Sequence, residues 1–319
     1  MYYTIRHLTN FDYDVPISES VMEARMQPRS DATQRCLHFG LSTSPSSCVM
    51  MYQDHDGNTV HHFDIPGRHA RLSLTAEALV ECLPSPLVPA TLDPGAWELL
   101  DAIVASGYYW EFLNPSAFAR ATPRLEALAS DIGLTRDLDP LAAMRRLTEE
   151  MYRRFEYVPQ STRVDSPIDD ALAERRGVCQ DFAHIFITLA RSIGVPCRYV
   201  SGYLFHQPDQ PTHDRSRDGA THAWAEAMLP GLGWIGFDPT NNVLALDRHI
   251  RVAIGRDYAD VPPTRGVFKG VSAVRSELAV AVTVGPAQSI PHGDVLPFVP
   301  WMSRPATGPM VEESGSQQQ

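Results

Sequence analysis

Three residues in the second half of the chain have the types needed for nucleophilic attack on a carbonyl carbon. Cys179 stands at the start of an apolar helical pattern, His222 lies in the alternating segment THAWAE, and Asp238 follows in GWIGFDPTN. In such a set the imidazole takes the thiol proton, and the carboxylate fixes the tautomer and orientation of the ring. The three residues therefore predict a cysteine nucleophile that forms a thioester.

The element expected to carry the nucleophile is a helix from about Val178 to Ile193. Its apolar face is formed by Phe182, Phe186, Leu189 and Ile193, and Gly194-Val195-Pro196 ends it. The positive end of a helix and its unpaired N–H groups favour a thiolate over a thiol. A cysteine considered alone is more often a small core residue than a catalytic one. The catalytic interpretation therefore depends on the histidine and the carboxylate that accompany it.

The histidine and the carboxylate are expected on neighbouring strands of a hairpin. Strand patterns at 220–228 and 234–237 flank a turn at Pro230–Gly233. If Met228 pairs with Trp234, residues of equal parity share a face, so His222 and Asp238 point the same way.

The remaining segments predict an α+β fold in several parts. Alternation before residue 82 predicts short strands, with DHDGN at 54–58 as a turn, and the proline-rich stretch at 82–89 reads as a linker. Asp139-Pro140 predicts a helix start, and 278–284 predicts a late strand. We expect an N-terminal small β-domain at 1–85, a catalytic core at 90–270 with the nucleophile helix packed on an antiparallel sheet, a C-terminal strand segment at 271–300, and a disordered tail at 306–319.

Composition excludes several classes of function. With 27 Lys+Arg against 38 Asp+Glu, the net charge of -11 disfavours binding to nucleic acid or to an anionic membrane surface. No apolar run approaches the roughly 20 residues of a membrane span, and the N-terminus lacks a signal-peptide pattern, which predicts a cytoplasmic protein. The five cysteines are scattered without a CxxC, so we expect neither a disulfide framework nor a structural zinc site, and no cofactor.

Three segments resemble the bacterial transglutaminase-like proteins, which are often labelled cysteine proteases. They are GVCQDFAHIFITLARSIGVPCRYVSGYL, THAWAEAMLPGLGWIGFDPTN and VAIGRDYADVPPTRGVFKG, and the β-rich start resembles the N-terminal region that accompanies this core. The resemblance implies a papain-like arrangement with Cys179 as nucleophile, His222 as general base and acid, and Asp238 as orienting carboxylate. Relatives are often encoded beside ATP-grasp proteins suspected of forming peptide-like products, which implies a functional link to such proteins.

Further residues in these segments are candidates for supporting roles. Gln160 or Tyr157 is expected to supply the second oxyanion-hole donor, beside the Cys179 N–H, and Trp224 to wall the cleft. Asp181, Arg198 and Glu226 are interpreted as an ion-pair network that braces the nucleophile helix against the sheet.

Three functions are consistent with these residues. The first is an amide-bond enzyme on a peptide or protein substrate: a peptidase, isopeptidase or amidase if water resolves the thioester, or a transamidase if an amine does. The second is a non-catalytic peptide-binding module on the same fold. The third is a metal site formed by Cys179, Cys197 and His222, although that spacing matches no recognised ligand pattern.

Overall fold

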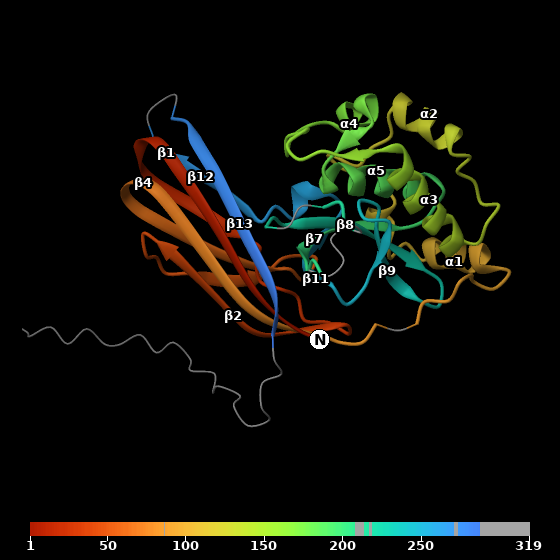
Figure 1. The fold of residues 1–319 in the computed structure, drawn as a ribbon, viewed down its shortest axis with the longest axis horizontal. Helices are drawn as coiled ribbons and strands as arrows, with labels where there is room; N and C mark the ends of the chain where they lie inside the picture. The colour runs from red at the N-terminus through yellow and green to blue at the C-terminus, as the bar shows by residue number, and fades with distance from the viewer. Residues whose placement is uncertain (86, 208–213, 217–218, 271–273, 288–319) are drawn as a thin grey trace, which may run out of the picture. The chain divides into compact units, whose positions relative to one another are not determined.

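The computed structural model describes residues 1–85, 87–207, 214–216, 219–270 and 274–287, so the predicted tail at 306–319 lies outside the described residues. Two antiparallel sheets, a two-stranded parallel pair and a group of helices make up this part of the chain (Figure 1). None of the described helices is long and apolar enough to span a membrane.

The N-terminal sheet has β1 and β4 at its centre. In the described residues it contains β1 (Tyr2–Ala24), β2 (Gln34–Ser44), β3 (Met50–Gln53), β4 (Thr59–Cys82), β12 (Thr264–Lys269) and β13 (Ser276–Ala287). The strands β1 and β4 are 23 and 24 residues long, so the prediction of short strands is wrong for them. The pairing of β1 with β4 shifts register twice between residues 12 and 19 of β1. Such bulges bend a strand without ending it, so each strand continues where a turn would otherwise divide it.

Strands from the far end of the described chain complete this sheet. β13 pairs with the first half of β1, from Tyr2 opposite Ala287 to Tyr13 opposite Ser276, and β12 pairs with its second half. Figure 1 shows these blue strands beside the red β1. The strand predicted at 278–284 is therefore present, and it is hydrogen-bonded to the N-terminal strands.

The second sheet carries two of the three residues predicted to be catalytic, His222 and Asp238. Its strand order is β10 (Val243–Ala245), β9 (Gly233–Asp238), β8 (His222–Leu229), β7 (Cys197–Leu204) and β11 (His249–Gly255). Met228 pairs with Trp234, which is the register that the sequence predicted. Alternate residues of β8, namely Ala223, Ala225 and Ala227, join the core formed with the helices, so His222 and Trp224 belong to the opposite face.

The helices follow in the order α1 (Ala96–Ala105), α2 (Pro123–Asp131), α3 (Pro140–Arg154), α4 (Ile168–Glu174) and α5 (Cys179–Ser192), with short 3₁₀ turns at Trp110–Phe112 and Tyr258–Asp260. α3 begins where predicted, because the Asp139 carboxylate accepts hydrogen bonds from the N–H groups of Leu141 and Ala142. α5 is apolar around most of its circumference and is buried from Gln180 to Arg191. Gly194, with a φ of 84°, ends it.

The ion-pair network predicted for Asp181, Arg198 and Glu226 does not form as one group. Glu226 is 1% exposed and accepts hydrogen bonds from Arg198 at 2.6 Å and from Arg251 at 3.0 Å. Asp181 takes no part in this group, because it caps α5. The expected brace between the nucleophile helix and the sheet is therefore wrong, and the ion pairs instead link β7, β8 and β11 within one sheet.

Replacing Glu226 by alanine is expected to lower the free energy of unfolding by about 3–5 kcal/mol, because two largely buried guanidinium groups lose their shared, fully buried carboxylate. Urea denaturation followed by circular dichroism measures this. Asp101→Ala is the matched control: its ion pair with Arg136 is half exposed, so we expect a loss below about 1 kcal/mol. Equal losses in the two variants would contradict the prediction.

Candidate active site

Cys179 occupies the first position of α5, and its thiol is half-buried. The start of the helix is fixed by Asp181, whose carboxylate accepts hydrogen bonds from the Val178 N–H at 2.8 Å and from the Thr162 hydroxyl at 2.5 Å. A Cβ on Gly177 would lie 2.9 Å from the Asp181 Cβ, so only glycine fits at the entry to the helix. The sequence prediction of a thiol at a helix N-terminus agrees with this geometry.

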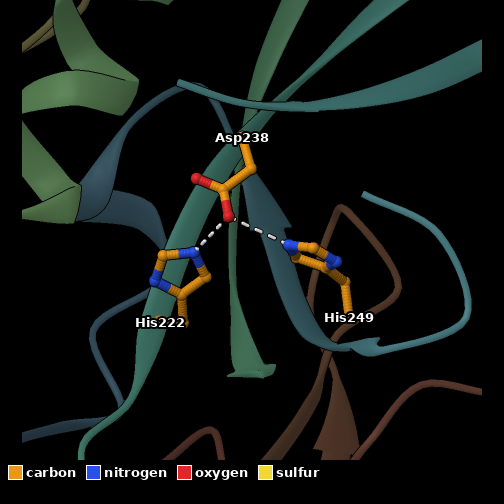
Figure 2. A group of neighbouring side chains, drawn as sticks. All are labelled: His222, Asp238 and His249. Atoms are coloured by element: carbon orange, nitrogen blue, oxygen red, sulfur yellow. Dashed lines mark hydrogen bonds and ion pairs between the residues drawn. The ribbon is translucent and has the colours of Figure 1, made fainter. Parts of the chain in front are cut away.

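His222 and Asp238 form a buried hydrogen-bonded pair. The Nε2 atom of His222 lies 2.7 Å from Oδ2 of Asp238, and the two side chains are 3% and 0% exposed. Figure 2 shows that the same carboxylate oxygen also faces a ring nitrogen of His249. The hairpin register thus brings together the histidine and the carboxylate that equal parity placed on one face.

Asp238 is surrounded by hydrogen-bond donors. Its Oδ1 accepts from the N–H groups of Thr240 and Asn241, and its Oδ2 accepts from His222, from His249 at 3.0 Å and from the Asn241 amide at 2.7 Å. Burial opposes the charged carboxylate, but these histidines outweigh it and hold the pKa of Asp238 far below its usual range. The carboxylate is ionised at every physiological pH.

The charge on Asp238 sets the protonation of His222. Burial favours the neutral ring, yet the carboxylate and the nearby Cys179 thiol outweigh it and raise the pKa of His222 to about 10. Its other nitrogen, Nδ1, is buried and makes no hydrogen bond within normal limits to any described residue. Nδ1 is therefore the ring nitrogen of His222 that is available for proton exchange with a thiol.

His249 was not predicted from the sequence, whereas Asn241, like Asn242, is an alternative orienting residue that the sequence places close to Asp238. His249 is buried, and burial lowers its pKa, so it donates to Asp238 as a neutral ring. Asn241 accepts hydrogen bonds from the N–H groups of Arg215 and Ser216, which aims its amide nitrogen at the carboxylate. The only sequence signal for His249 is its position at the start of the alternating run HIRVAIG, the same position that His222 has in its own strand.

Trp224 lies beneath the two histidines. Its ring stacks on His222 with centroids 6.0 Å apart and meets His249 edge-on at 5.1 Å. It is 1% exposed and lines a partly open pocket of about 120 Å³ together with Trp234 and His249. Trp224 therefore packs against both histidine rings and holds them in place.

The predicted oxyanion donors flank the segment that leads to Cys179. Tyr157 lies on the two-residue strand β5 (Glu156–Tyr157) and pairs with Gly177 of β6 (Arg176–Gly177), whereas Gln160 is exposed in the following turn with a φ of 62°. Ser161 is a further candidate, because its hydroxyl is buried and has no partner among the described residues. The assignment of the second donor stays a prediction.

The metal site considered from the sequence does not form in the described part of the chain. The groups of three potential ligands that lie within 4.8 Å there are His222, Asp238 and His249, and the surface group His55, Asp56 and Glu111. Cys197 belongs to neither and is fully buried in β7. In the first group both histidines already hydrogen-bond to the carboxylate, so the three side chains form a hydrogen-bond network.

Comparison with known proteins identifies the family. Residues 127–239 match the transglutaminase-like superfamily, and residues 3–81 match the bacterial transglutaminase-like N-terminal region. An uncharacterized protein of Mycobacterium leprae is 33% identical over 281 residues, which cover 87% of this chain and 96% of that protein. The chain belongs to the transglutaminase-like superfamily. The family and the α+β fold class predicted from the sequence are thereby confirmed.

Two further matches extend the transglutaminase-like comparison. A crystal structure from Cytophaga hutchinsonii, provisionally described as a cysteine protease, shares the fold with a TM-score of 0.66 and 22% identity, covering 91% of this chain and 93% of that one. A protein-glutamine gamma-glutamyltransferase of Pseudomonas aeruginosa is 27% identical over 173 residues, 47% of this chain and 24% of that protein.

The transglutaminase-like site predicts selective alkylation of Cys179. At about pH 6, iodoacetamide is expected to modify Cys179 first, because this half-buried thiol lies at the N-terminus of α5, and a helix N-terminus and a neighbouring imidazolium activate cysteines in general. Burial raises the pKa of Cys36 and Cys82 to about 11 and of Cys197 to about 12, which protects those thiols. Peptide mapping reads the order of labelling, and the exposed Cys48 is the internal comparison. Labelling of Cys48 before Cys179 would contradict the prediction.

The raised pKa of His222 also predicts how stability depends on pH. A pKa raised from 6.5 to about 10 on folding stabilises the protein fully below pH 6.5, and this contribution is lost as the pH rises toward 10. Thermal unfolding between pH 6 and pH 10 should therefore show a falling midpoint. The fall should be smaller in His222→Gln, which cannot titrate, and an identical fall in both proteins would show that another group is responsible.

Proposed function

We propose that this transglutaminase-like protein is a cysteine-dependent amide-bond enzyme that acts on a peptide or protein substrate through a thioester. One observation carries the proposal: His222 and Asp238 form a buried pair, and the Cys179 thiol at the start of α5 is among the groups that raise the pKa of His222. A nucleophile, a base and an orienting group in this order are the parts that covalent catalysis requires.

The residues support a two-step reaction. The Cys179 thiolate attacks the carbonyl carbon of an amide, and the His222 imidazolium gives its proton to the departing nitrogen, which leaves as an amine or ammonia. The carbonyl oxygen carries negative charge during this step and is stabilised by the Cys179 N–H and a second donor, for which Gln160, Tyr157 and Ser161 are the candidates. The resulting thioester is then attacked by water or by an amine, with His222 as the base.

The nature of the attacking group decides the enzyme class. Water gives a peptidase, isopeptidase or amidase, and an amine gives a transamidase. We propose hydrolysis as the main activity. The family match and the similarity to a gamma-glutamyltransferase support amide chemistry in general. A functional link to ATP-grasp enzymes that form peptide-like products is part of the same proposal.

A parallel assay with two acceptors tests the proposal. The protein is incubated with pooled peptides and isopeptides, with and without a fluorescent primary amine, and cleavage, ammonia release and amine incorporation are followed together. We expect cleavage or ammonia release without the amine, and a mass increase on Cys179 when the reaction is quenched in acid. Amine incorporation at the expense of hydrolysis would assign a transamidase. The absence of turnover and of any adduct in all pools would contradict the enzyme proposal.

A further inference from the structure

A basic groove lies beside the segment that enters the nucleophile helix. It has a volume of about 480 Å³, is open to solvent, and runs along residues 152–157. Its charged lining residues are four arginines and one glutamate, namely Arg153, Arg154, Arg175, Arg215 and Glu156. This concentration of positive charge contrasts with the net charge of -11 of the whole chain. A groove with walls of one sign attracts ligands of the opposite sign.

Two of these arginines have no carboxylate partner among the described residues. Arg153 and Arg154 both pair with Glu150, at 3.3 Å and 2.7 Å, so their charges are largely balanced. Arg175 and Arg215 form no ion pair within the described part of the chain, and the Nη1 atom of Arg175 is buried without a hydrogen-bond partner there. A buried donor without an acceptor costs free energy that a bound anion would recover.

The two guanidinium groups line the same groove and both contact Phe155. Arg215 donates hydrogen bonds to the carbonyl oxygens of Tyr152 and Phe155, and its guanidinium lies 3.3 Å from the centre of the Tyr152 ring. Arg175 lies over the ring of the same Phe155 at 5.2 Å. Like charges that share one neighbour repel one another, and an anion bound by both removes that repulsion.

Residues of the groove are linked to the segment that carries Cys179 and to the hydrogen bonds around Asp238. Arg175 precedes Cys179 by four positions, and the groove residue Tyr157 pairs with Gly177 at the entry to α5. Arg215 donates its backbone N–H to Asn241 at 2.7 Å, and Asn241 donates in turn to Asp238 at 2.7 Å. A ligand in the groove would therefore lie next to the nucleophile segment and next to the support of the base.

We propose that this groove binds a carboxylate of the substrate, and that the substrate is an acidic peptide held by Arg175 and Arg215. This inference rests on the proposed function and specifies its substrate class. Guanidinium groups suit carboxylates because their planar N–H donors match the two oxygen atoms. The same chemistry would accept inorganic phosphate, so the test includes that ion.

Binding is measured apart from turnover, in the full-length Cys179→Ala protein, by fluorescence anisotropy of a labelled glutamate-only peptide and of a glutamine peptide of equal length. We expect the glutamate peptide to bind at least roughly tenfold more tightly, with a preference that weakens as salt is added. Arg175→Gln and Arg215→Gln should each reduce its affinity by roughly tenfold to a hundredfold, since each removes charged hydrogen bonds. The exposed Arg120→Gln, outside the groove, is the matched control and should change nothing.

A variant with a reversed charge preference distinguishes a specific effect on the groove from misfolding. The double replacement Arg175→Glu with Arg215→Glu should reverse the preference toward a lysine peptide, which loss of structure cannot produce. Equal binding of the glutamate and glutamine peptides by the protein would overturn the proposal, as would an unchanged preference in both glutamine variants. Competition by inorganic phosphate without a preference for glutamate would also overturn it and would assign a phosphate site. If the preference is found but no pool yields an adduct on Cys179, the substrate class stands and the catalytic proposal fails.

Discussion

Replacing Cys179 by alanine is expected to abolish formation of the acyl-enzyme completely. The reaction requires a bond between Sγ and the carbonyl carbon of the substrate, and His222 and Asp238 can activate no other group at that position. Turnover should fall to the background that the remaining site provides. Acid-quenched mass spectrometry of the intact protein measures the adduct, and product formation is followed in parallel.

Cys48→Ala is the control for the general effect of removing a thiol, because Cys48 is exposed and lies far along the chain from the site. It should keep wild-type turnover. If Cys179→Ala also kept wild-type turnover, the nucleophile assignment would be wrong. An unchanged thermal midpoint in both variants would show that the loss is chemical.

Asp238→Asn is expected to leave the thiol able to form the adduct, but with a rate reduced by roughly 10²–10⁴-fold. Five N–H groups point at the carboxylate, so the amide nitrogen of an asparagine must face at least one other donor. If that nitrogen faces His222, the ring takes the tautomer with its proton on Nδ1, where it cannot accept the proton of the thiol. In addition, the loss of the carboxylate charge lowers the pKa of His222.

Single-turnover kinetics over a range of pH measures both effects. We expect a slower acylation step and a pH profile displaced to lower pH, because the imidazolium is no longer stabilised by a charge. If Asp238→Asn were silent, Asn241 would be the next orienting candidate, since its amide lies 3.5 Å from Nε2 of His222. A silent Asp238→Asn combined with an inactive Asn241→Ala would move the orienting role to that residue.

Local patterns predicted the parts of the site that depend on short stretches of chain. The helix that begins at Cys179 follows from its apolar spacing and from the glycine and proline that end it. The common face of His222 and Asp238 follows from one turn length, because a tight hairpin fixes the register of its own strands.

His249 escaped prediction because its place depends on a distant pairing. It lies on β11, which pairs with β7, and the register of that pair shifts between Arg251 and Ala253. A bulge breaks the alternation between the residues before it and those after it, so the pattern of the later residues of β11 cannot tell which side of the sheet His249 occupies. The His249 donor to Asp238 is visible only when β7, β8, β9 and β11 are assembled.

The N-terminal sheet was only partly predicted for a related reason. The alternation of β1 indicates a strand with one buried face, as observed for Tyr3 and Ile5. Alternation does not identify the partner, and β13 comes from the other end of the described chain. The three prolines at 82–89 were correctly taken as an interruption, because β4 ends at Cys82.

The pairing of β1 with β12 and β13 sets an order for folding during synthesis. β1 is the first strand to be made, but half of its hydrogen-bonding edge stays open until residues 276–287 have been translated. The local hairpin of β8 and β9 and the helix before it can assemble earlier, since their contacts are close in sequence. Until β13 arrives, the open edge of β1 can pair with another chain. A shortened protein that ends near residue 270 would keep this edge permanently exposed, so a tendency to aggregate is expected to distinguish it from the full chain.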